Sequence, residues 1–369
     1  MPEVLFVAGE ASGDLHAAGV AEELRELRPD LELTGFGGPL MAKAGVALFD
    51  RYETGLMGFV EVIRHIPSHF DLLKKIRRRI ESGNVALLIV IDYPGFNMKA
   101  ASAARDAGVP VLYYVTPQVW AWGEGRVTKL ARIVTKAAVI LPFEENLLRG
   151  FGVDATFVGH PLLDRTGGLQ SRDEARKALR LSLVRPVLAL FPGSRQQEID
   201  RHIDDFVDAA REVERRCPAL QVIVGVAPTI TLEPSRCPFR LVHSASFSVL
   251  RAADAALCKS GTTTLEAALA ECPLVIAYRT SAISYALARL LVKIPHIGLV
   301  NVVAGREVAR EFVQDDLEPM AVAAQLERLL DHDDPERLRV LQGLGEVRSK
   351  LGTPGAARRV AEMASELAR

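Results

Sequence analysis

Short apolar runs alternate with longer amphipathic stretches along most of the chain. The runs are rich in Val, Ile and Leu, which is typical of strands buried on both faces of a parallel sheet. They predict strands at residues 4–8, 31–36, 86–91, 111–115, 137–141 and 155–158, and then at 187–191, 220–226, 239–242, 255–258 and 274–277. The alternation occurs twice over, so we expect an α/β fold with two parallel sheets, each covered by helices on both faces.

The stretches between these strands repeat apolar residues every three or four positions, which predicts helices. They lie at residues 15–27, 70–80, 98–107, 144–151, 195–216, 262–270 and 281–292. A polar stretch with two consecutive glycines, at residues 162–172, interrupts the pattern. We therefore expect an N-terminal domain of residues 1–165 and a C-terminal domain of residues 166–339, with the charged helical residues 340–369 joining the first domain.

Composition narrows the class of protein. With 369 residues the chain suits two domains, and 49% hydrophobic with 25% charged residues is the balance of a folded soluble protein. A net charge of −1 gives no global attraction to nucleic acid. The four cysteines are scattered, there is no leader-like segment, and no apolar run is long enough to span a membrane, so we expect a cytoplasmic protein. No dinucleotide fingerprint or metal-ligand spacing is present, and we expect neither a cofactor nor a metal.

Polar and glycine-rich residues follow several of the predicted strands. Ligands of parallel sheets bind beyond the carboxyl ends of the strands, so these loops, which we call the rim of each sheet, are candidate sites. Two domains with such rims imply a cleft between them. In the first domain, Glu10 and Ser12 follow the first strand and Asp92 follows the strand at 86–91.

Asp92 is a candidate general base, because partial burial at the end of a strand would raise its pKa. The alternative is an Asx-turn in Asp-Tyr-Pro-Gly, which is a favourable turn sequence. For the loop at Glu10, Ser12 or Asp14 could cap the helix that begins near Leu15. Two acids at one rim also suit recognition of hydroxyl groups.

In the second domain, the strand at 255–258 leads into Ser-Gly-Thr-Thr-Thr-Leu-Glu. Ser260, Gly261, Thr262 and Thr263 place hydroxyls and backbone N–H groups at the start of a helix, an arrangement that favours a phosphate or diphosphate. Glu266, about one turn later, could accept hydrogen bonds from the two hydroxyls of a ribose. The alternative is an ordinary Ser/Thr helix cap.

Gly193, Ser194 and Arg195 follow the strand at 187–191. A cation at a helix start opposes the helix dipole, and an anionic ligand would reconcile the two. Glu198 could orient Arg195 or bind a hydroxyl; alternatively, the two residues form a surface ion pair of little energetic value. Asn301 could hydrogen-bond an amide or hydroxyl group of a ligand; alternatively, it only stabilises a turn of the backbone.

The segment of residues 56–80 is both apolar and basic. Its apolar side chains exceed what one core-facing stripe requires, and they include Met57, Phe59, Val60, Ile63 and Ile66. Five cations follow directly: Lys74, Lys75, Arg77, Arg78 and Arg79. This pattern suits an anionic membrane surface, and a second such stretch lies at 283–294. The usual alternative is an amphipathic core helix with a solvated basic face.

Taken together, these segments resemble the lipid-A-disaccharide synthase family, glycosyltransferase family 19, of the GT-B fold. The matching motifs occur in the family's order and span about residues 4–314. They are GEASGD at 9–14, MGFVEV at 57–62, DYPGFN at 92–97, VWAW at 119–122, LPFE at 141–144, GHP at 159–161, PGSR at 192–195 with Glu198, SGTTTLE at 260–266, YR at 278–279 and NVVAGR at 301–306.

The resemblance implies two Rossmann-like domains with sheets facing across a cleft. It also implies transfer of 2,3-diacylglucosamine from its UDP derivative to 2,3-diacylglucosamine 1-phosphate (lipid X), with a new β-1,6 linkage, inversion and release of UDP. As partners it implies the anionic inner-membrane surface, on its cytoplasmic face, and a second copy in a homodimer; from the net charge we expect no nucleic acid.

Combined with the rims, the resemblance leads to a division of roles. Asp92 is the expected base, Glu10 the second choice and Ser12 a positioning group. Arg195 and the helix start at Ser260 are expected to stabilise the leaving UDP, Glu266 to hold the ribose and Asn301 to help fix the donor. Alternatives are another GT-B enzyme acting on a soluble UDP-sugar, such as an epimerase or a peptidoglycan glycosyltransferase, or a binding protein without chemistry.

Overall fold

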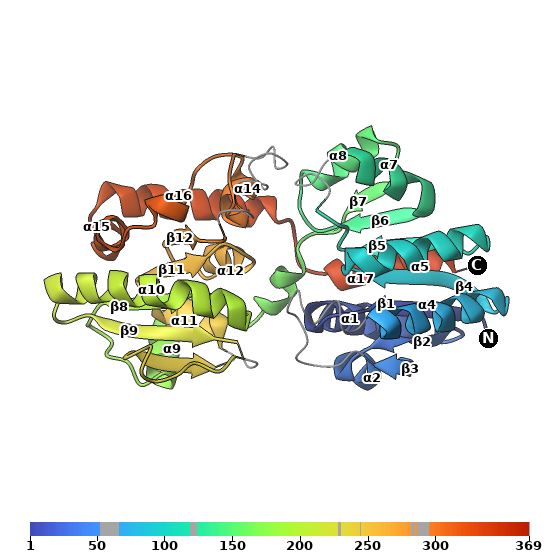
Figure 1. Ribbon diagram of the computed structural model, residues 1–369, viewed down its shortest axis with the longest axis horizontal. Helices are drawn as coiled ribbons and strands as arrows, with labels where there is room; N and C mark the ends of the chain where they lie inside the picture. Colours follow the sequence, from blue (N-terminus) through green and yellow to red (C-terminus); the bar gives the residue numbers. More distant parts are fainter. Residues whose placement is uncertain are drawn as a thin grey trace. The chain divides into compact units, whose positions relative to one another are not determined.

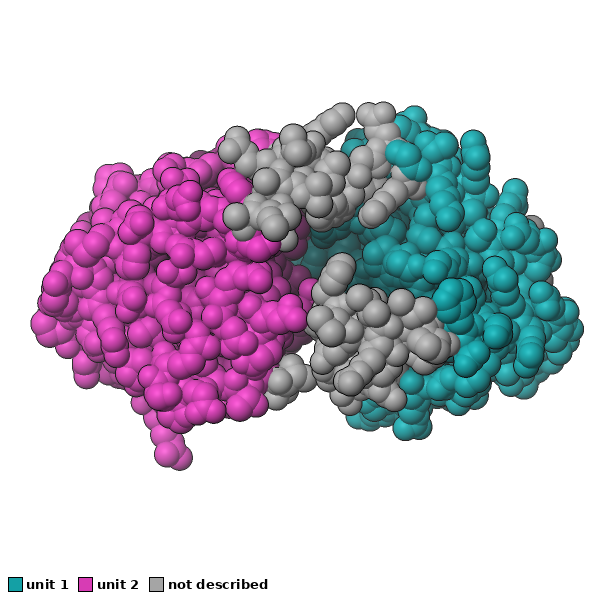
Figure 2. All heavy atoms as spheres, viewed as in Figure 1, with its two compact units in different colours: residues 1–164, 352–369 teal, residues 165–351 magenta. Residues whose placement is uncertain are grey.

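The computed structural model describes residues 1–51, 66–118, 124–227, 230–243, 245–281, 285 and 295–368 (Figure 1). The chain divides into two compact units, coloured separately in Figure 2. Unit 1 consists of Met1–Asp164 together with Gly352–Arg369, and unit 2 of Arg165–Leu351. Among the described residues, no helix has the length and apolar character needed to cross a bilayer.

Unit 1 is built on a seven-stranded parallel sheet in the order β3-β2-β1-β4-β5-β6-β7. The strands are β1 (Glu3–Ala8), β2 (Glu32–Gly37), β3 (Ala47–Arg51), β4 (Val85–Ile91), β5 (Val111–Tyr114), β6 (Lys136–Val139) and β7 (Ala155–Phe157). The helices are α1 (Ala11–Leu27), α2 (Pro39–Lys43), α4 (Ile66–Glu81), α5 (Pro94–Asp106), α7 (Glu124–Ile133), α8 (Glu144–Gly150) and α17 (Ala356–Leu367).

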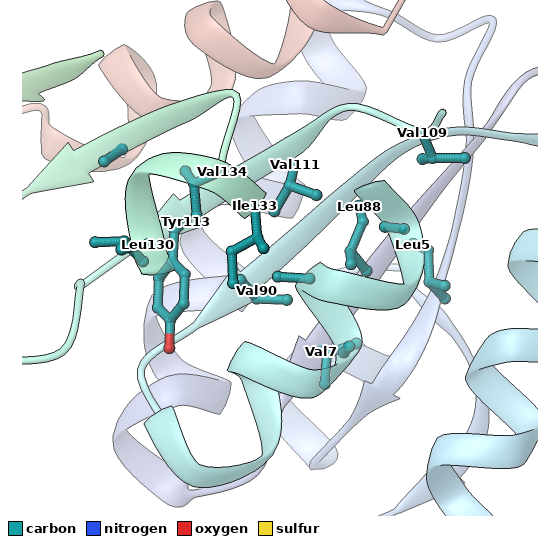
Figure 3. Close-up of a cluster of buried hydrophobic side chains, with 14 of the residues drawn as sticks. Leu5, Val7, Leu88, Val90, Val109, Val111, Tyr113, Leu130, Ile133 and Val134 are labelled. Carbon is teal, nitrogen blue, oxygen red and sulfur yellow. The ribbon is translucent and has the colours of Figure 1, made fainter. Parts of the chain in front are cut away.

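Two apolar cores lie on the two faces of this sheet, because successive side chains of a strand point to opposite faces. On one face, Leu5 and Leu88 pack with residues of α4, α5 and α7. Figure 3 shows this core, with Tyr113 of β5 among its members. On the other face, Phe6 packs with residues of α1 and α17, which lie side by side in Figure 1.

Unit 2 is built on a six-stranded parallel sheet in the order β10-β9-β8-β11-β12-β13. The strands are β8 (Val187–Phe191), β9 (Gln221–Val226), β10 (Arg240–His243), β11 (Ala255–Lys259), β12 (Leu274–Tyr278) and β13 (Glu311–Val313). The helices are α9 (Arg172–Ala178), α10 (Gln196–Arg216), α11 (Ser246–Ala252), α12 (Thr263–Leu269), α14 (Leu299–Ala304), α15 (Pro319–Leu330) and α16 (Pro335–Lys350), and a short 3-10 turn lies at Gln314–Asp316. A second 3-10 turn, Pro161–Arg165, spans the boundary between the two units.

The predicted strands are all present within a residue or two of their expected bounds, whereas β3 and β13 were missed. The predicted helix at 281–292 lies almost entirely outside the described residues.

The expectation that residues 340–369 join the first domain is wrong in part. Residues 340–351 belong to unit 2, because α16 packs against α12 and α14, and only the segment from Gly352 onward returns to unit 1.

Candidate functional site

The two acidic candidates of unit 1 lie at the carboxyl ends of neighbouring strands. Glu10 follows β1 and Asp92 follows β4, and these strands pair in parallel with Ala8 opposite Ile91. Both acids are half-buried, while Ser12 is exposed in the first turn of α1. The rim of unit 1 therefore carries two carboxyl groups and a hydroxyl on adjacent strand ends, as expected from the sequence.

Helix capping in this loop differs from the expectation. Helix α1 begins at Ala11, and its N-cap residue is Glu10, whose side chain makes no capping hydrogen bond. Asp14 is 1% exposed and accepts hydrogen bonds from the N–H groups of Gly38 (3.0 Å), Leu40 (3.1 Å) and Met41 (3.0 Å) at the start of α2. Its carboxylate thus holds a neighbouring helix, and neither Ser12 nor Asp14 caps α1.

The backbone is left-handed at two successive residues of the second loop, Asp92 (φ 49°) and Tyr93 (φ 47°), and again at Val115 (φ 57°) after β5. Non-glycine residues adopt this conformation at an energetic cost, and such strain clusters at functional sites. The three residues lie at the ends of paired strands, because β4 and β5 are neighbours with Ile91 opposite Tyr114. The sequence showed no signal for Val115.

In unit 2, the loop after β8 is organised by Glu198. Its Oε2 accepts hydrogen bonds from the N–H groups of Ser194 (2.9 Å) and Arg195 (3.3 Å), and its Oε1 lies 2.8 Å from Nζ of Lys259. Burial alone would raise the pKa of Glu198, but Lys259 and the loop N–H groups bring it below its ordinary value. Glu198 pairs with Lys259 and binds the backbone of Arg195. The Arg195 side chain is exposed just before α10.

Lys259 is a residue that our sequence reasoning missed. It ends β11 directly before Ser260, and its ammonium group lies 5.6 Å from the ring centre of Tyr278 in β12. His202 of α10 contributes a second link: its Nδ1 is 2.7 Å from the carbonyl oxygen of Glu198, and its Nε2 accepts from the N–H of Arg279 at 2.9 Å. The loops after β8, β11 and β12 are therefore joined by side-chain bonds. Its position directly before the SGTTTLE motif could have identified it from the sequence as a residue of the rim.

The hydroxyls of the SGTTTLE segment divide into structural and exposed ones. Ser260 Oγ donates to the carbonyl oxygen of Ile297 (2.6 Å), and Thr264 Oγ1 donates to that of Gly261 (2.8 Å). Helix α12 begins at Thr263, and its N-cap residue Thr262 makes no side-chain capping bond. Within the described part of the chain, no hydrogen bond engages the backbone N–H groups of residues 261–263. The simple capping alternative is therefore wrong, and Ser260 holds the loop rather than facing a ligand.

Glu266 lies inside α12 and is 8% exposed. Burial raises the pKa of its carboxyl group, while Arg165, whose Nη1 is 3.6 Å from Oε1, and a hydrogen bond with Ser246 act in the opposite direction. The guanidinium of Arg165 also lies 5.4 Å from the ring centre of Phe247. Glu266 is therefore a largely desolvated carboxyl group with a nearby countercharge.

Our expectation for Asn301 is wrong. The residue is fully buried, and its amide makes hydrogen bonds at both ends. Nδ2 donates to Ala309 O (2.7 Å) and Glu311 Oε1 (2.8 Å), and Oδ1 accepts from the N–H groups of Val308 (2.8 Å) and Ala309 (2.9 Å). An amide has two donors and two acceptor positions, so none remains for a donor sugar. Asn301 joins α14 to β13 and its preceding turn.

Most of the expected membrane-facing residues lie outside the described residues: Met57, Phe59, Val60 and Ile63, and most of the second stretch at 283–294. The tryptophans of the VWAW motif, at 120 and 122, also lie outside them. Ile66 begins α4, and its side chain is likewise not described. Of the cations on α4, Lys75 pairs with Asp50 and Arg79 with the buried Glu3, while the exposed Lys74 lies 3.5 Å from Asp71 one turn earlier. Lys74, Arg77 and Arg78 are exposed beside Phe70, which is 56% exposed; we call these four residues the basic face of α4.

Over the residues that can be placed, no group of His, Cys, Asp and Glu side chains is arranged to hold a metal ion. The acidic stretch at 331–334 contains His332. Its Nε2 is 3.3 Å from Oδ1 of the buried Asp254. This histidine therefore has a structural partner.

Comparisons with known proteins point to one family over nearly the whole chain. A family model described as lipid-A-disaccharide synthetase matches residues 4–349. The lipid-A-disaccharide synthase of Myxococcus xanthus (strain DK1622) is 42% identical, covering 99% of this chain and 97% of the relative. That of Geobacter sulfurreducens is 41% identical with the same coverage of both chains.

Solved structures are similar in fold. The calicheamicin glycosyltransferase CalG4 matches with a TM-score of 0.62 at 17% identity, covering 100% of this chain and 99% of that one. The S. aureus MnaA-UDP co-structure matches with a TM-score of 0.66 at 11% identity, covering 99% and 96%. At these identities the likeness concerns the fold alone, and it confirms the expected GT-B class of two Rossmann-like units.

Proposed function

The chain belongs to the lipid-A-disaccharide synthase family and is a glycosyltransferase of lipid A disaccharide synthesis, and from this premise we propose how its residues divide the reaction. It uses a UDP-sugar donor and a lipid acceptor. We propose that the donor is UDP-2,3-diacylglucosamine and the acceptor 2,3-diacylglucosamine 1-phosphate. The acceptor's primary hydroxyl attacks the anomeric carbon, the bond to the UDP oxygen breaks, and the α-linked donor gives a β-linked product.

Asp92 takes the proton of the attacking hydroxyl. Its position at the end of a central strand and its left-handed backbone support this role, because strained backbone is retained where surrounding structure enforces it for a purpose. Glu10, on the neighbouring strand end, is the second candidate base. Ser12, exposed beside it, would hydrogen-bond the acceptor.

The main support for the donor-binding role of unit 2 is that β8 pairs with β11. This pairing brings the exposed guanidinium of Arg195 and the unengaged N–H groups of residues 261–263 to the same rim. Arg195 and the N–H groups of residues 261–263 are groups that stabilise negative charge, and the charge on UDP grows as the glycosidic bond breaks. Gly193 and Ser194 shape the loop that presents Arg195. Glu266 accepts the ribose hydroxyls, with Arg165 as its countercharge.

We also propose that the enzyme works at an anionic membrane surface, on its cytoplasmic side. The basic face of α4 supports this, since it combines three exposed cations with an exposed aromatic ring. A homodimer is expected from the family resemblance alone, and light scattering of the purified protein tests it.

An assay for UDP release tests the proposal. Wild-type enzyme should release UDP from the acylated donor only when lipid X is present. An epimerase acting on a soluble UDP-sugar, or a binding protein, would not show this dependence.

Asp92→Asn should lower kcat by roughly 10²–10⁴-fold while UDP affinity, measured by calorimetry, stays close to wild type. A parallel loss of UDP affinity would exclude Asp92 as the base.

Arg195→Ala tests the donor side. It should lower kcat/KM for the donor by roughly 10–100-fold and weaken UDP binding. Arg211→Ala is the matched control, because Arg211 is an exposed arginine of α10, the helix that Arg195 precedes, and lies well away from its start. Equal kinetics of the two variants would remove Arg195 from the site.

A further inference from the structure

The conformation of Asp92 needs a physical explanation. Both Asp92 and Tyr93 lie in the left-handed region, with φ 49° and φ 47°. For residues other than glycine, this conformation costs on the order of 1–2 kcal/mol each. Aspartate tolerates it better than most residues, but tyrosine does not. Contacts from the surrounding structure must therefore hold this turn.

Two side chains bind the carbonyl oxygen of Asp92. The phenol of Tyr113 donates to it at 2.8 Å, and Nδ2 of Asn97 donates to it at 2.8 Å and to the carbonyl oxygen of Ile91 at 3.0 Å. On the other side of the same residue, the N–H of Asp92 donates to the carbonyl oxygen of Tyr114 at 3.0 Å. The peptide groups before and after Asp92 are both fixed, and the left-handed turn is fixed with them.

Tyr113 is placed for this bond by the core of unit 1. Its ring is fully buried between the sheet and the helices that cover it, with Leu130 and Val134 of the same cluster (Figure 3). A buried phenol needs a hydrogen-bond partner. Burial and the charge of Asp92 hold the pKa of Tyr113 well above its ordinary value, so the phenol keeps its proton and donates throughout the working pH range.

We propose that Tyr113 and Asn97 are positioning residues that set the direction of the Asp92 carboxylate by binding the carbonyl oxygen of the same residue. This inference rests on the proposed role of Asp92 as base. Side-chain direction follows from the backbone, and a base must lie within hydrogen-bond reach of the proton that it removes. Relaxation of the turn to a right-handed or extended conformation would redirect the carboxylate while leaving the donor rim of unit 2 unchanged.

Tyr113→Phe removes one hydroxyl from this arrangement and keeps the ring. Tyr114→Phe is the matched control, because Tyr114 is the next residue of β5, is equally buried and packs in the core on the opposite face beside His16. Its backbone bond to Asp92 is retained in the variant. Each variant loses one hydroxyl from a buried ring, and only the Tyr113 hydroxyl binds the loop of Asp92.

We expect Tyr113→Phe to lower kcat by roughly three- to tenfold, with KM for lipid X and UDP affinity near wild type. Tyr114→Phe should keep wild-type kcat. Asn97→Ser should act in the same direction as Tyr113→Phe. In an Asp92→Asn background, Tyr113→Phe should cause no further loss, because the group that it positions is gone.

The outcomes separate the inference from the proposal on which it rests. If Asp92→Asn is inactive and Tyr113→Phe behaves like Tyr114→Phe, the positioning role is refuted and the base assignment stands. If Tyr113→Phe lowers kcat equally in both backgrounds, its effect does not pass through Asp92 and the inference is again refuted. If Asp92→Asn retains activity, the base assignment itself is wrong.

Discussion

The aromatic ring of Tyr93 lies directly against the backbone of Gly9: a Cβ atom at position 9 would stand 2.4 Å from Cδ1 of the ring. Gly9 precedes Glu10, and Tyr93 follows Asp92, so this contact joins the two acidic loops of unit 1. Burial, and then the charge of Glu10, raise the pKa of the Tyr93 phenol. The close approach explains why a glycine stands at this position.

We predict that Gly9→Ala separates the two loops. The new methyl group must displace the Tyr93 ring, which should lower the free energy of unfolding by about 1–3 kcal/mol and reduce kcat. Gly95→Ala is the control, because a Cβ atom there meets nothing within 4 Å. Denaturant unfolding and the UDP-release assay measure both effects. Indistinguishable behaviour of the two variants would show that the packing of Tyr93 on Gly9 is unimportant.

Lys259→Met should act on the donor side only. It removes the partner of Glu198 but keeps a side chain of similar length against Tyr278, so the loops after β8 and β11 lose their ionic connection. We expect KM for the UDP-sugar to rise about tenfold and KM for lipid X to stay constant. In a double variant with Glu198→Gln the losses should be less than additive. Fully additive losses would mean that the two residues act independently.

Asn301→Ala should be a stability variant. It leaves the N–H groups of Val308 and Ala309 without their acceptor and Glu311 without one of its donors, which should lower the free energy of unfolding by about 2–4 kcal/mol. The folded fraction should keep its KM for the UDP-sugar. Urea unfolding and initial-rate kinetics at low temperature test this. A large rise in donor KM without loss of stability would restore a binding role.

Neutralising the basic face of α4 should weaken membrane binding. We expect the triple variant Lys74→Gln, Arg77→Gln, Arg78→Gln to lose about 1 kcal/mol of binding per charge on vesicles of phosphatidylcholine with phosphatidylglycerol. A control variant neutralises Arg105, Lys129 and Arg132, which are exposed on other helices of unit 1. Co-sedimentation at low and high salt measures the difference. Equal losses in both triple variants would indicate a general charge effect rather than a binding face.

Acid should destabilise the protein through His160. Burial, and then the charge of His16, lower the pKa of His160 to about 4, whereas the unfolded chain takes up this proton near 6.5. The unfolded state therefore binds the proton first as the pH falls, and stability is lost between about pH 6.5 and 4, by about 3 kcal/mol in all. In the wild type, Nδ1 of His160 accepts a hydrogen bond from the N–H of Leu162 at 3.2 Å. His160→Asn keeps an acceptor for this N–H but removes the titrating group, so it should flatten the pH dependence of the free energy of unfolding. The same change at the exposed His243 should not.

The central strands were readable from the sequence because strands buried on both faces form continuous apolar runs. The two missed strands, β3 and β13, are the edges of their sheets, where short and half-exposed segments lose that pattern. The rim loops were likewise found, since polar residues directly after buried strands stand out.

The roles of individual polar side chains were harder to predict. Asn301 and Ser260 stand in motifs that suggested ligand contacts, yet their hydrogen bonds are used within the fold. Asp14 was expected to act locally and instead holds α2. The phenol that binds Asp92 comes from the next strand, at Tyr113, and carried no local signal. Sequence proximity shows which groups stand at a rim, but not which of them already have partners from distant segments.

The return of α17 to unit 1 has a consequence for synthesis of the chain on the ribosome. Unit 2 emerges completely before residues 352–368 do, whereas unit 1, although made first, still lacks a helix of one core, where Val360 and Ala364 pack with residues of α1. Domains generally fold as they emerge, N-terminal first. In this chain the apolar face of β1 and α1 stays uncovered until α17 arrives, so the second unit can reach its native state earlier than the first. A nascent-chain arrest series would then show protease-resistant unit 2 while unit 1 is still cleaved.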